Sequence, residues 1–116
     1  MRIEIKGRKV AVTDDLRLRV EKRFAKIARQ VPDLAQLEIE LSEDQNPRVA
    51  DKQIAEATLR LKGTSLRARE SASNMVTAIN SCSDDLARQV KRYRAKRSGR
   101  REAAANAVSA QAPPAV

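Results

Sequence analysis

Positively charged side chains are the residues of this sequence that are most clearly suited to a chemical role, the binding of anions. Residues 86–102 contain eight lysines and arginines and one carboxylate, Glu102, which gives this stretch a net charge of +7. A second, looser group nearer the N-terminus comprises Lys22, Arg23, Lys26 and Arg29. Grouped cations bind the phosphates of a polyanion and displace its condensed counterions, with an affinity that falls as salt is added.

Charge is distributed unevenly along the 116 residues, whose 24 basic and 15 acidic side chains leave a net +9. Residues 1–32 carry +6, residues 33–56 carry −5 and residues 57–85 carry +1. The acidic middle stretch has two interpretations. It is either a solvated strand face with its loop, or a negative edge that is repelled by RNA and so orients the protein on it.

The side chains that most enzymes and metal sites require are scarce. The sequence has no histidine, the commonest zinc ligand and proton shuttle. Asp84 and Asp85 are adjacent, and because neighbouring helix positions point about 100° apart, they cannot share one substrate. Cys82 is the only cysteine and lies on an apolar stripe, so we expect it to be buried and inert. We therefore expect no enzyme activity, no cofactor, no metal ion and no small-molecule substrate.

The length of the chain allows one domain with a modest core. We expect this domain to span residues 1–97, and residues 98–116, which lack an amphipathic pattern, to form a disordered tail. No run of about 18 apolar residues exists, which excludes a membrane-spanning segment. A single cysteine cannot form an internal disulfide, so a reducing, cytoplasmic location is expected.

Hydrophobic periodicity predicts an α+β fold with the order β-α-β-β-β-α. Period-two alternation predicts strands at residues 2–6, 37–42, 55–62 and 66–69, the first ended by Gly7. Apolar spacings of three and four predict one helix capped by Thr13 and another that is capped by Ser71 or Ser73 and runs to about Arg97. Each strand has one apolar face, so we expect both helices to cover one face of a four-stranded sheet, whose first two strands are parallel.

Helical spacing then assigns the cations to faces of the two helices. Most of the basic residues between Arg88 and Lys96 share one side of the last helix, and Arg94 and Arg97 widen that band around Tyr93. If the helices pack side by side, the two basic bands form one groove-like phosphate surface. The predicted RNA-binding residues are Lys22, Arg23, Lys26, Arg29, Arg88, Lys91, Arg92, Arg94, Lys96 and Arg97. For the first helix, a merely solvated face is an equal alternative.

Several segments in one register resemble a known family. Besides the opening strand, they are VTDDL at residues 12–16, AEATL at 55–59, NMVTAIN at 74–80 and DLARQVKRY at 85–93. Together they resemble the ribosome hibernation-promoting factor family, also called ribosome-associated inhibitor A or ribosomal subunit interface protein, over residues 1 to about 97. The resemblance implies a fold similar to a double-stranded RNA-binding domain.

The resemblance also implies a function. The family binds the small ribosomal subunit and its rRNA in the channel used by messenger and transfer RNA, which inhibits translation and preserves idle ribosomes in stationary phase or stress. A cytoplasmic protein that is monomeric when off the ribosome is therefore expected. Because the chain ends at Val116, without the second domain of long members, promotion and prevention of ribosome dimers both stay open.

Two hypotheses from other classes compete with ribosome binding. One is a protein-interaction module that modulates a transcription (sigma) factor through the acidic strand edge. The other is a small RNA-processing or hydrolytic enzyme, which the absence of histidine and of suitable carboxylate pairs disfavours. Co-sedimentation with ribosomes across a salt series distinguishes the first two hypotheses.

Overall fold

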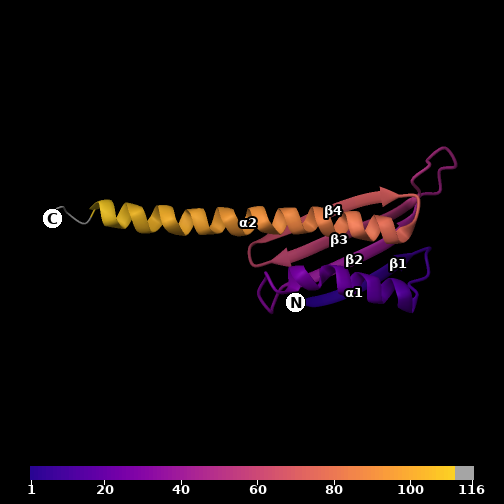
Figure 1. The fold of residues 1–116 in the computed structure, drawn as a ribbon, viewed down its shortest axis with the longest axis horizontal. Helices are drawn as coiled ribbons and strands as arrows, with labels where there is room; N and C mark the ends of the chain where they lie inside the picture. Colours follow the sequence, from indigo (N-terminus) through magenta and orange to yellow (C-terminus); the bar gives the residue numbers. More distant parts are fainter. Residues whose placement is uncertain (112–116) are drawn as a thin grey trace.

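The computed structural model describes the backbone of residues 1–111 and the side chains of residues 1–97. It has the predicted α+β architecture, with one four-stranded sheet and two helices in the order β-α-β-β-β-α (Figure 1). The elements are β1 (Arg2–Arg8), α1 (Asp14–Ala28), β2 (Gln36–Glu43), β3 (Gln53–Leu61), β4 (Thr64–Ala72) and α2 (Met75–Gln111). The strand order is β1-β2-β3-β4; β1 pairs with β2 in parallel, as predicted, and the other pairs are antiparallel.

Both helices lie on one face of the sheet, contact each other and run in the same direction (Figure 1). They begin at the end of the sheet that holds the loop of residues 44–52 and run toward the end that holds the β3–β4 turn. The end of α1 and the part of α2 that lies beside the β3–β4 turn, at residues 92–97, are therefore at the same end of the domain.

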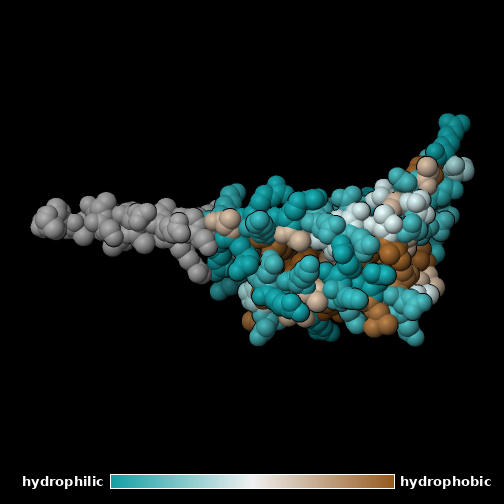
Figure 2. All heavy atoms as spheres, viewed as in Figure 1, coloured by the Kyte–Doolittle hydropathy of each residue, from teal (hydrophilic) through white to brown (hydrophobic). Residues whose placement is uncertain are grey.

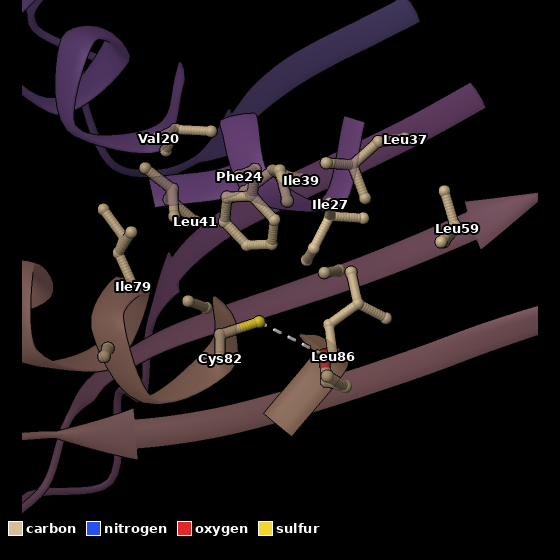
Figure 3. Packing of buried hydrophobic residues seen from close by; sticks show 14 of the residues in the cluster. Val20, Phe24, Ile27, Leu37, Ile39, Leu41, Leu59, Ile79, Cys82 and Leu86 are labelled. Carbon is tan, nitrogen blue, oxygen red and sulfur yellow. Dashed lines mark hydrogen bonds between the residues drawn. The ribbon is translucent and has the colours of Figure 1, made fainter. Parts of the chain in front are cut away.

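The core fills the space between the helices and the covered face of the sheet (Figure 3). Its largest fully buried side chains are Val20, Phe24 and Ile27 of α1, Leu37, Ile39 and Leu41 of β2, Leu59 of β3, and Ile79, Cys82, Leu86 and Val90 of α2. These residues follow the period of 3.6 on the helices and the period of two on the strands, because only one side of each element is covered. The opposite face of the sheet is open to solvent.

The two helices begin with side-chain caps, one of which the sequence analysis identified. Thr13 Oγ1 accepts a hydrogen bond from the backbone N–H of Leu16 at 3.2 Å, as predicted. For α2 the prediction of Ser71 or Ser73 was wrong, because Asn74 Oδ1 accepts the N–H of Thr77 at 2.8 Å. The reason is that β4 extends to Ala72, farther than its alternating pattern indicates, and so delays the start of α2.

Two predicted element ends also differ from the structure. Strand β1 continues through Gly7 to Arg8 before the chain turns so tightly that a Cβ on Gly7 would lie 2.1 Å from the carbonyl oxygen of Val10. Helix α2 continues to Gln111 instead of ending near Arg97. The missing amphipathic stripe there argues against packing, not against a helix, and the Ala-rich sequence has high helix propensity. Residues 112–116 lie outside the described residues, and the division into domain and tail stays a prediction.

Candidate nucleic-acid interface

The outer face of α1 carries a row of exposed cations. Lys22, Lys26 and Arg29 follow one another at intervals of four and three, as the sequence analysis proposed. Arg19 is also exposed and precedes Lys22 by three residues, so it extends the row by one turn. The sequence analysis missed Arg19, although its spacing already placed it there. We call these four residues the α1 row.

Arg23, a predicted RNA-binding residue, instead joins α1 to α2. Its Nη2 atom lies 2.9 Å from Asp84 Oδ1 and 3.3 Å from the carbonyl oxygen of Asn80, and its Nε donates to Ser83 Oγ at 3.2 Å. The Arg23 side chain is 35% exposed. Three of its five N–H donors thus already have acceptors on α2, so Arg23 links the two helices and has fewer donors left for a phosphate.

The cations of α2 divide between two sides of the helix. The contacts of Arg23 identify the side of α2 that faces α1. Lys91 follows Asp84 by seven residues, or two turns, and Arg94 follows Asn80 by about four turns, so both lie on that side. Arg88 is on the outer surface, with its guanidinium 3.9 Å from the carboxylate of Asp85.

Lys91 and Arg94 of α2 and the α1 row therefore lie on neighbouring sides of the two helices, and we call this set of residues the helix surface. Among the side chains described, no carboxylate lies within 4.0 Å of the cationic groups of these residues. Figure 2 shows hydrophilic residues over most of α1 and α2, with hydrophobic residues gathered toward the end where both helices begin. The basic end of the domain is thus also its more polar end.

The remaining predicted cations of α2 lie on its other side. Arg92, Lys96 and Arg97 line a cleft between α2 and the β3–β4 turn. Lys62, from the end of the hairpin, faces them across this cleft and was not predicted as a site residue. No local pattern marks Lys62, because only the tertiary fold brings the hairpin beside the helix. Three of the cations predicted for α2 thus line this cleft, while Lys91 and Arg94 lie on the side of α2 that faces α1.

The open face of the sheet is also charged, and three of its cations are paired with glutamates, whereas Arg2, Arg8 and Arg69 have no described carboxylate within 4.0 Å. The Nη2 atom of Arg60 lies 2.9 Å from Glu38 Oε2, and that of Arg67 lies 3.9 Å from Glu56 Oε1. Lys6 Nζ lies 3.6 Å from a carboxylate oxygen of Glu4. The acidic middle stretch of the sequence thus supplies the carboxylates of β2 and β3 that neutralise cations on neighbouring strands.

The described residues hold little that would support metal or thiol chemistry. Within residues 1–97, no group of three or more Cys, Asp or Glu side chains is placed to hold a metal ion. Burial raises the pKa of Cys82 from 9.0 to about 12, assisted by the negative charges of Asp85 and Glu70. The thiol lies 3.5 Å from the carbonyl oxygen of Ala68 (Figure 3) and stays protonated at neutral pH. In the described part of the chain, no helix is long and apolar enough to cross a membrane.

Comparisons with known proteins agree with this architecture. The chain is 33% identical over 102 residues to a ribosome hibernation promotion factor of Picosynechococcus sp., covering 87% of this chain and 53% of the relative. It is 30% identical over 96 residues to a ribosome hibernation promoting factor of Salmonella typhimurium, covering 83% of this chain and 96% of the relative. The chain thus spans about half the length of the first relative and nearly all of the second.

The fold is also present among solved structures. The N-terminal domain of Thermus thermophilus Protein Y superposes with a TM-score of 0.69 at 31% identity, over 80% of this chain and 99% of that domain. The sequence pattern of one family matches residues 3–98, which include every element from β1 to the basic part of α2. The chain therefore belongs to the family described as Sigma 54 modulation protein / S30EA ribosomal protein.

Proposed function

We propose that this protein is a non-enzymatic ribosome-binding hibernation factor. It occupies the channel of messenger and transfer RNA on the small ribosomal subunit, contacts rRNA there through the helix surface, and inhibits translation under stress or in stationary phase. The site of action is the cytoplasm, where the ribosomes are.

The observation that carries this proposal is the packing of α1 and α2 in the same direction. In this arrangement Lys26 and Arg29, at the end of α1, and Lys91 and Arg94 of α2 lie toward the end of the domain that holds the β3–β4 turn, which supports a shared phosphate-binding surface. These cations have no carboxylate within 4.0 Å among the described side chains, so their charge is available to phosphates. The open sheet face, where three cations are paired with glutamates, offers much less.

The names of the relatives favour the ribosome over a transcription factor. Both curated relatives described above are named as ribosome hibernation factors. The family description keeps sigma-54 modulation as an alternative partner. A protein partner held by the acidic strand face would have to compete with the arginines that already occupy Glu38 and Glu56.

Co-sedimentation of the purified protein with small subunits through sucrose gradients, across a salt series, tests the proposal. The test variant neutralises the helix surface as Lys26→Gln, Arg29→Gln and Lys91→Gln. The matched control removes the same charge elsewhere, as Arg2→Gln, Arg48→Gln and Arg69→Gln. We expect the test variant to bind more weakly and the slope of log affinity against log salt to fall by about two to three, while the control stays near the parent protein.

Two results would contradict the proposal. One is a parent protein that fails to sediment with small subunits even at low salt, and the other is an equal loss of affinity in both variants. The same gradients, scored for free subunits, single ribosomes and dimers, measure the effect of the protein on ribosome pairing. A salt-insensitive complex with a sigma factor would favour the alternative function.

A further inference from the structure

A cleft of about 940 Å³ lies between the β3–β4 turn and α2, and no residue of the helix surface lines it. Its volume is within the range of roughly 300–1,000 Å³ that is usual for small-molecule sites. The hydrogen bond from Gln89 Nε2 to the carbonyl oxygen of Arg67, at 2.6 Å, ties α2 to β4 beside the cleft. The two walls are thus held in a fixed relation.

One part of the cleft is strongly cationic. Lys62 comes from the hairpin, and Arg92, Lys96 and Arg97 come from α2. None of the described residues that line the cleft is acidic, and no described carboxylate lies within 4.0 Å of the four cationic groups. Cations from two elements that converge on one space suit a phosphate, which accepts several charge-assisted hydrogen bonds at once.

Another part of the cleft is apolar. Tyr93 and Leu66, both half-buried, line it, and the Tyr93 hydroxyl lies 3.3 Å from an Nη atom of Arg97. Gly63, at the turn, also lines the cleft and would have nothing within 4 Å of an added Cβ. An aromatic ring next to an arginine is a surface on which a nucleobase stacks.

We propose that this cleft binds a single nucleotide, with its phosphate at Lys62, Arg92 and Lys96 and its base against Tyr93 and Leu66. The nucleotide is either one that is extruded from an RNA strand or a free nucleotide. An acidic peptide would satisfy the cations but would leave the aromatic and aliphatic surface unused. The site does not include the helix surface, so it adds to the proposed function and does not depend on it.

The chain contains one tyrosine and one phenylalanine, which makes the site directly observable by NMR of the aromatic rings. Titration with adenosine monophosphate should shift the ring signals of Tyr93, in the cleft, and leave those of Phe24, 1% exposed in the core, in place. Ribose 5-phosphate, which lacks the base, should bind about tenfold more weakly. Equal affinities for the two ligands would overturn the proposal, since the cleft would then bind phosphate alone.

Calorimetric titration of variants separates the two parts of the cleft. Lys62→Ala should lower the affinity of the protein for adenosine monophosphate about tenfold, as expected for the loss of one charge-assisted hydrogen bond. Tyr93→Leu should lower the affinity for adenosine monophosphate to the affinity that the parent protein has for ribose 5-phosphate. Arg48→Ala, which removes the same charge from the loop at the opposite end of the sheet, should change nothing. Equal losses in Lys62→Ala and Arg48→Ala would refute the site.

Two further titrations identify the source of the nucleotide and exclude another ligand class. A short single-stranded oligonucleotide that binds tighter than the monophosphate indicates RNA, and the reverse order indicates a free nucleotide. Oligoglutamate that binds as well as either of them would overturn the proposal. All these measurements use isolated protein. If the cleft binds no nucleotide but the protein still binds ribosomes, only the cleft proposal is rejected. If the cleft binds a nucleotide but the protein does not bind ribosomes, only the proposed function is rejected.

Discussion

The helix surface and the open face of the sheet contain the same kinds of residue but differ in how their charges are matched. On the sheet, Arg60 and Arg67 lie 2.9 and 3.9 Å from the carboxylates of Glu38 and Glu56. On the helices, the described cations of the helix surface have no such neighbour. Density of cations in sequence is therefore a poor guide to binding. What matters is whether a carboxylate on an adjacent element has already neutralised them.

The largest expected effect comes from weakening the packing between the helices and the sheet, which holds the two compared surfaces in place. Leu86 of α2 is fully buried between α1, α2 and the sheet (Figure 3). Leu86→Ala should lower the free energy of unfolding by about 2–5 kcal/mol, because it removes buried methyl groups and leaves a cavity. Urea denaturation measures the change. Leu18→Ala, at a site that is 62% exposed, should shift it by no more than about 0.5 kcal/mol.

The second test asks whether water is excluded from the core between the helices and the sheet, although both outer surfaces are exposed to solvent. Since the Cys82 pKa is about 12 in the folded protein against an ordinary 9.0, the folded state favours the protonated thiol. The stability this contributes is complete below pH 9 and is lost as the pH rises toward 12. The free energy of unfolding should fall by about 1.4 kcal/mol per pH unit in that window. Cys82→Ala should show a visibly flatter alkaline dependence in urea titrations; an identical dependence would show that water reaches the thiol.

The third test gives the open face of the sheet cations without neighbouring carboxylates, as on the helix surface. Glu38→Gln with Glu56→Gln removes the carboxylates beside Arg60 and Arg67. Non-specific affinity for single-stranded RNA should rise a few-fold, and its salt slope should steepen by up to about 1.4, at roughly 0.7 per phosphate. Filter binding across a salt series measures both. Glu21→Gln with Glu43→Gln changes the net charge equally, and an equal effect in this control would mean that local pairing does not matter.

The smallest expected effect concerns the ion pair between Arg23 and Asp84. A double-mutant cycle with Arg23→Met and Asp84→Asn should give a coupling of about 0.5 kcal/mol in thermal or urea unfolding, since both side chains are partly exposed. The pair of Arg88 and Asp85, at 3.9 Å, should give less. If Arg23→Met weakened ribosome binding and Asp84→Asn did not, Arg23 would contact RNA as the sequence analysis proposed.

The fold was predictable because burial on one side leaves a visible period in the sequence. Alternation in the strands and the stripe on each helix led directly to the observed element order and to the parallel pairing of β1 with β2. The end of α2 was not predictable in this way. A helix that continues past the sheet needs no apolar stripe, so its sequence shows only propensity, which is a weak signal.

The candidate site was predictable only in part, for a different physical reason. Spacing gives the direction of a side chain around its own helix, but not the element that lies in that direction. Arg23 sits beside the apolar stripe, and its acceptors are about 60 positions away in the sequence. The position of Lys62 was unpredictable for the same reason, because the sequence around it does not indicate that Arg92 and Lys96 lie across the cleft.

The strand order leaves β1 and β4 as the two edges of the sheet. An exposed edge is a template on which another strand can pair, and a second copy of the same chain always offers one. Here β1 carries Arg2, Lys6 and Arg8, and β4 carries Arg67 and Arg69. Both edge strands carry more cations than carboxylates, so edge-to-edge pairing of two copies would bring an excess of like charge together. The cations on the edge strands thus oppose self-association through the sheet edges.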